Sequence, residues 1–207
     1  MQVDFGVELG TEDEVLEMPW AAGETGPRYW DLKRHPEQLS NVVEANRFPE
    51  LAEFLGAVNS ASSIFESAKC DVWSSAEINP EEEIFGASHK FGSYVDLVFA
   101  DEESRASFVQ HEKLVNRITE LLRRVPEIPA AAEFLLRRCY YHTRNLDQPR
   151  QGFYITFYLF GYGADERQAR QQWAIGMKLV ENVIRQISAQ RTCDLRVQPP
   201  ESRPRMD

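Results

Sequence analysis

The sequence predicts an α+β protein, with a mainly antiparallel or mixed sheet of five or six strands and helices packed on one face. Residues 94–100 and 153–162 are nearly continuous runs of β-branched and aromatic residues, which is typical of interior strands. Each run is followed by an acidic helix start and a long amphipathic pattern. Because these strand–helix units alternate with hairpin-like strands, a ferredoxin-like arrangement is the leading specific expectation.

The first part of the chain predicts short elements. Residues 2–9 alternate apolar and acidic side chains and predict a half-buried strand, and residues 28–34 predict a second short strand. Between them, Thr11 followed by Glu14 matches a capping box, so we expect a short helix that ends before Pro19.

The middle of the chain predicts one helix and three strands. Apolar residues at helical spacing after Pro49 predict a helix that ends near Asn59. Residues 70–78 predict a strand, and residues 84–87 and 91–100 predict a hairpin.

The C-terminal half predicts long helices. One follows Asp101, and a second carries an apolar stripe over residues 173–187 with steps of four and three. Residues 129–142 predict a further helix between them. We expect a single domain over residues 1–189, followed by a disordered polar tail with three prolines over residues 190–207.

Composition excludes several classes of protein. The chain has 207 residues and a net charge of −10, so a generic nucleic-acid binder is not expected. It shows no signal peptide and no apolar run of about 20 residues, so no membrane association is predicted. Its three cysteines, Cys70, Cys139 and Cys193, suit reduced thiols, and a cytoplasmic location is the default expectation.

Four aspartates stand between apolar neighbours in strand-like stretches: Asp4, Asp31, Asp71 and Asp96. Strands disfavour aspartate, so one sheet face should be apolar and the other should carry carboxylates. Separate solvated acids are the simpler interpretation. The alternative is a divalent cation site for metal-assisted hydrolysis or phosphoryl transfer, which needs several carboxylates to converge.

The last strand sorts its residues between two faces. Tyr154, Thr156 and Tyr158 point away from the core, and pleating places Tyr94 and Asp96 on the same outer face. Tyrosine rings suit both a solvated face and the wall of a ligand site. We therefore predict an uncovered face that presents Tyr, Thr and Asp, with a groove for a small molecule or peptide as the functional interpretation.

A basic aromatic cluster surrounds His142. Arg137, Arg138 and Arg144 are expected to pair with the aspartates of the sheet, or alternatively to bind an anionic ligand. Cys139 and His142 form a lone C-x-x-H, which is a weak zinc signal because structural zinc takes four ligands.

No catalytic residues are evident. A Cys–His nucleophile would pair Cys70 with His111 or His142, but nothing local indicates a lowered thiol pKa. His111 falls on the apolar stripe of its helix, so a hydrogen-bonded core residue is the simpler interpretation.

The sequence therefore favours a ligand- or protein-binding module that uses an aromatic and acidic sheet face, with a metal-assisted enzyme as the alternative. No cofactor is predicted. A homodimer formed by two tyrosine-lined faces is also expected, because uncovered aromatic area favours association.

Overall fold

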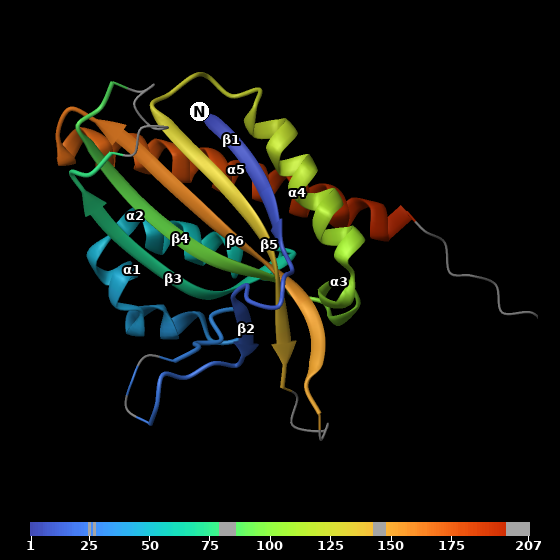
Figure 1. The fold of residues 1–207 in the computed structure, drawn as a ribbon. Helices are drawn as coiled ribbons and strands as arrows, with labels where there is room; N and C mark the ends of the chain where they lie inside the picture. The colour runs from blue at the N-terminus through green and yellow to red at the C-terminus, as the bar shows by residue number, and fades with distance from the viewer. Residues whose placement is uncertain (25, 27, 79–85, 143–147, 198–207) are drawn as a thin grey trace, which may run out of the picture.

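The computed structural model describes residues 1–24, 26, 28–78, 86–142 and 148–197, and it confirms the predicted α+β class (Figure 1). In this described part, six strands form one mixed sheet in the order β1-β5-β6-β4-β3, and β2 also pairs with β5. The strands are β1 (Gln2–Glu8), β2 (Val15–Met18), β3 (Phe65–Ser75), β4 (His89–Phe99), β5 (Ala130–Tyr141) and β6 (Arg150–Gly163). The helices are the 3-10 helix η1 (Pro36–Asn41), α1 (Val43–Arg47), α2 (Pro49–Val58), α3 (Glu102–Ala106), α4 (Phe108–Leu122) and α5 (Glu166–Val197).

One face of the sheet packs against α2, α4 and α5. Figure 1 looks onto the opposite face, with the strands passing in front of α2 and α5. The covered face forms the main core, where Phe157 of β6 meets Phe54 of α2 at a ring-centroid distance of 5.6 Å and stacks on Phe134 of β5 at 5.1 Å. Trp173 of α5 is fully buried there, and its indole Nε1 donates to the Ser93 hydroxyl at 2.8 Å.

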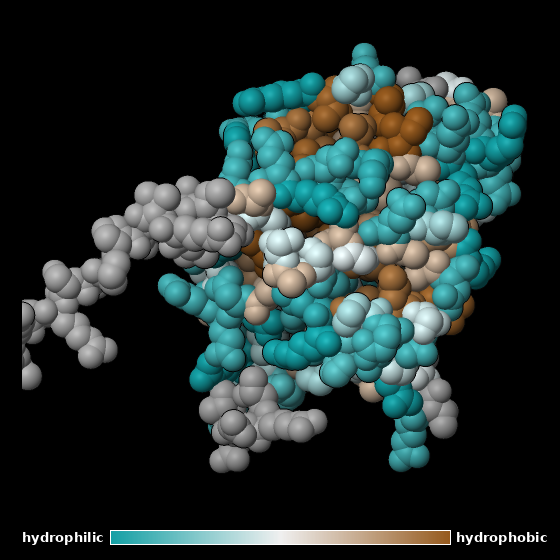
Figure 2. Space-filling view, turned by 180° about the vertical axis from the view of Figure 1, so that it is seen from behind, coloured by the Kyte–Doolittle hydropathy of each residue, from teal (hydrophilic) through white to brown (hydrophobic). Residues whose placement is uncertain are grey.

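The two predicted interior strands are confirmed. β6 lies at the centre of the sheet and pairs antiparallel with both β4 and β5. The predicted helix after Pro49 is confirmed as α2, and the long C-terminal helix is confirmed as α5. The outer surface of the helix layer is mainly hydrophilic with some apolar areas (Figure 2). Val109 of α4 and Ile175 of α5 are among the exposed apolar residues.

β1 and β2 share one edge of the sheet. Both run parallel to β5: β1 pairs with residues 131–137 and β2 with residues 138–141. The chain leaves this edge between Glu8 and Val15 and returns to it. A ferredoxin-like arrangement is not confirmed, because the order of elements along the chain differs from β-α-β-β-α-β.

Two predicted helices are wrong. The capping-box segment after Thr11 contains β2 instead, where Leu16 and Met18 alternate with exposed residues and are buried. Residues 129–142 contain β5, although Ala, Leu, Glu and Arg favour a helix locally. Pairing with strands on both sides, and burial of both faces of β5, override that local preference.

Several strand boundaries also differ from the prediction. Residues 28–34 form an isolated bridge and a turn, in which Asp31 accepts a hydrogen bond from the Arg34 amide at 3.0 Å. The strand predicted from Cys70 begins at Phe65, and it is the antiparallel partner of β4. The proposed hairpin partner at residues 84–87 falls partly outside the described residues.

The helices of the C-terminal half begin at side-chain caps. Asp101 accepts from the Ser104 amide and opens α3, and Ser107 accepts from the Gln110 amide and opens α4. α5 continues to Val197, beyond the predicted domain limit at residue 189. The rest of the predicted tail lies outside the described residues.

Candidate functional site

The sheet face opposite α2, α4 and α5, here called the second face, is covered over only part of its length. A smaller apolar cluster around β2 covers one end. It is formed by Leu16, Met18, Ala68, Val98, Cys139, Tyr141 and Tyr154, with Trp20 and Tyr29 packed against it. The other end carries half-buried aromatic rings, so the candidate site lies there.

A chain of polar side chains crosses the second face at the boundary between its two ends. The Thr156 hydroxyl on β6 donates to Asp96 on β4 at 2.7 Å and accepts from Arg137 on β5 at 3.2 Å. Arg137 in turn donates from Nε to Glu8 at 2.7 Å and from Nη1 to Glu14 at 3.3 Å. Glu8 and Glu14 lie at the two ends of the segment that connects β1 to β2. Arg137 therefore attaches this connecting segment to the sheet.

Asp96 is the most deeply buried carboxylate of this group, at 3 % exposure. Burial raises the pKa of its carboxyl to about 7, and the negative charge of Glu14 acts in the same direction, whereas the Thr156 hydrogen bond lowers it. A bulge in β3 faces Asp96, because two residues, Ala68 and Lys69, stand between the pairs on either side of it. The charge of Lys69 also lowers the pKa of Asp96, though by less than burial raises it.

The next row of the second face runs in register across five strands. Asp71 lies opposite Tyr94, Tyr94 opposite Tyr158, Tyr158 opposite Glu133, and Glu133 opposite Asp4. Two tyrosines therefore occupy the centre of the row, and carboxylates flank them on both sides. Glu133 and Asp4 are adjacent like charges, and partial burial together with the charges of Glu8 and Asp4 raises the pKa of Glu133.

The row after that completes an aromatic platform, which we define as Trp73, Tyr94, Tyr158 and Phe160. Trp73 meets Phe160 edge to face at a centroid distance of 5.9 Å, across Gly92 of β4. Tyr158 lies parallel to Phe160 at 6.3 Å and 5.9 Å from Tyr94. A Cβ atom on Gly92 would lie 2.8 Å from the Trp73 ring, so the missing side chain of this glycine makes room for the indole.

The structure places most of the predicted ligand residues on the second face. Tyr94, Asp96, Thr156 and Tyr158 lie together near or at its open end. Tyr154 shares that face but is fully buried in the smaller cluster, and its hydroxyl has no hydrogen-bond partner among the described residues.

Arg138 and His142 do not join this group. Arg138 donates to the Leu9 carbonyl, and strand alternation directs its side chain away from that of Arg137. His142 is exposed and contacts Glu17 of β2. Arg144 lies outside the described residues.

The four strand aspartates do not converge. Asp4 lies on β1 and Asp71 on β3, at opposite edges of the sheet, while Asp31 pairs with Arg34 at 2.8 Å in a turn. Among the described residues, no group of three His, Cys, Asp or Glu side chains could hold a metal ion. Cys139 is buried, while the His142 side chain is exposed beyond the end of the same strand.

Cys70, Cys139 and His111 lack the features of a nucleophilic site. Burial raises the pKa of the Cys70 thiol and of the Cys139 thiol to about 12, which keeps both protonated at neutral pH. His111 is fully buried between Phe99 and Phe153, and its Nδ1 lies 2.8 Å from the Ser107 carbonyl. Burial lowers its pKa, as expected of a neutral core histidine.

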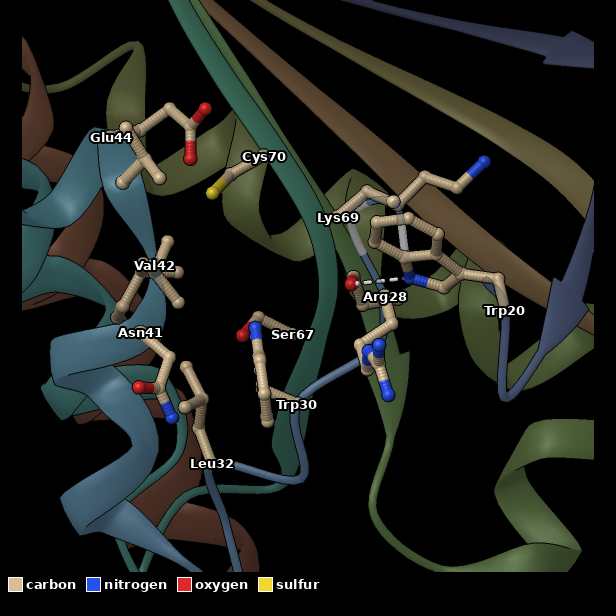
Figure 3. A pocket seen from close by; sticks show the side chains of 14 residues that line it. Trp20, Arg28, Trp30, Leu32, Asn41, Val42, Glu44, Ser67, Lys69 and Cys70 are labelled. Atoms are coloured by element: carbon tan, nitrogen blue, oxygen red, sulfur yellow. Dashed lines mark hydrogen bonds between the residues drawn. The ribbon is translucent and has the colours of Figure 1, made fainter. Parts of the chain in front are cut away.

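A cavity of about 400 Å³ lies between α1 and the bulge of β3, and the sequence did not indicate it (Figure 3). In Figure 3 Trp30 stands in its middle, Glu44 points toward Cys70 at one end, and Arg28 lies on the other side of Trp30. Only the aliphatic stem of Lys69 borders the cavity, because its ammonium points away from it. The remaining lining is mainly apolar and includes Trp20, Leu32, Val42, Leu55 and Ala68.

No protein-family model, curated protein or solved structure matches this chain. No helix in the described ranges combines the length and the apolar character needed to cross a membrane. The candidate site therefore has to be interpreted from its own geometry and charge.

Proposed function

We propose that the protein is a binding module whose aromatic platform and flanking carboxylates receive a basic partner. The observation that carries this proposal is the row Asp71–Tyr94–Tyr158–Glu133–Asp4, in which acids flank two tyrosine rings. Aromatic faces and carboxylates both attract ammonium and guanidinium groups. A net charge of −10 adds a long-range field that favours basic partners.

The spacing of the acids indicates an elongated partner. Asp71 and Glu133 stand three strand spacings apart, which is roughly 14 Å between their backbones. One small cation cannot contact both, whereas two basic groups on one extended molecule can. A cation beside Glu133 and Asp4 would also relieve the repulsion between these neighbouring carboxylates.

Selection of a randomised peptide library on the immobilised protein tests the proposal. We expect enrichment of lysine and arginine in the retained peptides. Fluorescence anisotropy with a labelled Lys-rich peptide should then show affinity reduced roughly threefold to tenfold by Tyr158→Ala. The matched control is Val109→Ala, which truncates an exposed side chain on α4 away from the sheet and should leave affinity unchanged.

Two results would contradict the proposal. One is retention of acidic or purely apolar peptides in place of basic ones. The other is an equal affinity for the labelled peptide in Tyr158→Ala and in Val109→Ala.

A further inference from the structure

In the part of the chain that the structure describes, β3 forms one edge of the sheet and its one strand partner is β4 (Figure 1). The outer edge of its first half is capped by side chains. Lys33 donates to the Phe65 carbonyl at 2.9 Å, and the Ser67 amide donates to Asn59 at 3.0 Å. At the bulge, the Trp20 indole donates to the Ala68 carbonyl at 2.8 Å. Such capping protects an edge from pairing with another chain.

Among the described residues, the second half of the same edge has no comparable set of side-chain caps. Phe65 and Ser67 point their backbone groups away from β4, and the register shows that Cys70, Val72 and Ser74 repeat this orientation beyond the bulge. In the described ranges, the only cap on these three residues is the carboxylate of Asp71, which accepts from the amide of its neighbour Val72 at 2.7 Å. Outward-facing backbone donors and acceptors therefore extend over five residues.

We propose that an extended basic peptide segment binds by adding a strand to this outer edge of β3, between Cys70 and Ser74. The inference rests on the proposed function and names the partner class for the same site. Residues of the added segment would exchange backbone hydrogen bonds with the outward-facing residues Cys70, Val72 and Ser74, and the side chains of the segment would alternate between the two faces of the sheet.

Charge selects the occupant. Side chains of the added strand that project onto the second face would lie beside Asp71 and Trp73, the acid and the ring at the β3 end of the platform. Glu44, at the end of the nearby cavity, and Glu77, just after β3, add negative charge around this edge. A second copy of the chain would bring the same acids against each other, whereas a basic segment is complementary to them.

The cavity beside the bulge would bind a second side chain of the added strand. It borders Ser67–Cys70 of β3, so one end of an added strand reaches its mouth. Leu32, Val42 and Leu55 line it, and the Cys70 thiol is protonated because burial raises its pKa to about 12. An apolar side chain next to the basic residue therefore fits there, which gives a pattern of alternating basic and apolar residues.

The test uses a fluorescein-labelled heptapeptide of alternating lysine and valine, and the same peptide methylated on every backbone nitrogen. Methylation removes the backbone donors and keeps the charges and side chains. We expect anisotropy to show affinity about tenfold lower for the methylated peptide, as the loss of two backbone hydrogen bonds implies. Hydrogen exchange should show new protection of the Ser74 amide with the first peptide alone, whereas the Val72 amide already donates to Asp71.

Strand addition can also be tested by placing a proline in the β3 edge of the protein. Ser74→Pro removes one outward amide and leaves the β3–β4 ladder intact, because that amide faces away from β4. It should weaken binding of the unmethylated peptide about tenfold, while Ser74→Thr, which keeps the amide, should stay within about twofold.

The outcomes separate the two proposals. Equal binding of both peptides would overturn strand addition and leave the basic-partner function standing. Peptide binding that depends on Ser74 but not on Tyr158 would support strand addition and contradict the role of the platform. No detectable binding of either peptide at millimolar concentration would overturn both proposals, and a dimer that buries the β3 edge would overturn strand addition alone.

Discussion

Asp96 and Arg137 hydrogen-bond to the same atom, the hydroxyl of Thr156, from the two strands that flank β6. The hydroxyl donates to the buried carboxylate and accepts from the guanidinium, so it acts as both a hydrogen-bond donor and an acceptor. Asp96 is buried away from solvent, and Thr156 is itself 1 % exposed. This bridge joins β4 to β5 below the open end of the second face and supports the platform above it.

Replacing the bridging hydroxyl should destabilise the fold. Thr156→Val keeps the shape of the side chain but leaves the Asp96 carboxylate and one Arg137 donor without this partner, at a cost of about 1–3 kcal/mol. Chemical denaturation measures this. Thr119→Val is the control, because the buried Thr119 hydroxyl donates only to the Val115 carbonyl within α4. Equal losses in the two variants would contradict the bridge.

The stability of the protein should depend on pH through Asp96. Its folded pKa of about 7 lies above its ordinary value of 3.8, so the folded state binds more protons than the unfolded state between these values. The unfolding free energy contributed by this group therefore falls as pH rises from about 4 to 7, by at most roughly 1.4 kcal/mol per unit. Asp96→Asn removes the effect.

Denaturation of the wild type and of Asp96→Asn from pH 4.5 to 8 measures this difference. The variant should gain stability relative to the wild type as pH rises through that window. A difference that stays constant with pH would show that the burial of Asp96 does not raise its pKa in the folded protein.

The contact between Trp73 and Gly92 predicts a third result. Gly92→Ala places a Cβ atom 2.8 Å from the indole, so the ring must move and the fold should lose about 1–2 kcal/mol. Gly56→Ala is a matched control, because Gly56 is an exposed position of α2, and among the described residues no atom beyond its chain neighbours and the backbone of its own helix lies within 4 Å of the added Cβ. It should stabilise by about 0.5–1 kcal/mol. Thermal unfolding and tryptophan fluorescence check both.

The alternation of side chains along each strand is the feature of the sequence that predicts the candidate site best. It placed Tyr94, Asp96, Thr156 and Tyr158 on one face, because a pleated strand admits only two directions for a side chain. Strand order leaves no local signal in the sequence, so the sequence alone is compatible with a metal site formed by four aspartates that the structure separates. Nothing in the sequence around Asp4 and Asp71 indicates that their strands lie at opposite edges of the sheet.

The errors occurred where tertiary pairing overrides local preference. Helix-favouring residues in β5 become a strand because β6 and β1 pair with both of its sides. The sequence does not indicate why a glycine stands at position 92. The reason is tertiary, because the missing side chain leaves room for the Trp73 ring from the neighbouring strand. The sequence predicts that Arg137 pairs with aspartates of the sheet, but its acidic partners are Glu8 and Glu14. Both lie more than 120 residues away along the chain, so no local pattern indicates them.

The pairing of Arg137 with Glu8 and Glu14 leads to a further prediction. Arg137 is 8 % exposed, whereas both acids are accessible enough to regain water when it is removed. Arg137→Met should therefore cost about 1–3 kcal/mol, less than breaking a fully buried pair. This loss of stability should be accompanied by faster hydrogen exchange in residues 9–14, because the segment that connects β1 to β2 loses its attachment to β5.

A surface ion pair provides the comparison. Arg117 contacts Glu120 at 3.3 Å within α4, and both side chains are more than 40 % exposed, so Arg117→Met should change stability by less than about 0.5 kcal/mol. The double variant Arg137→Met with Glu8→Gln should lose less than the sum of its single changes, because both remove the same contact. Strict additivity of the two changes would mean that the contact between Arg137 and Glu8 adds no stability, and that Arg137 acts through Glu14, Thr156 and packing.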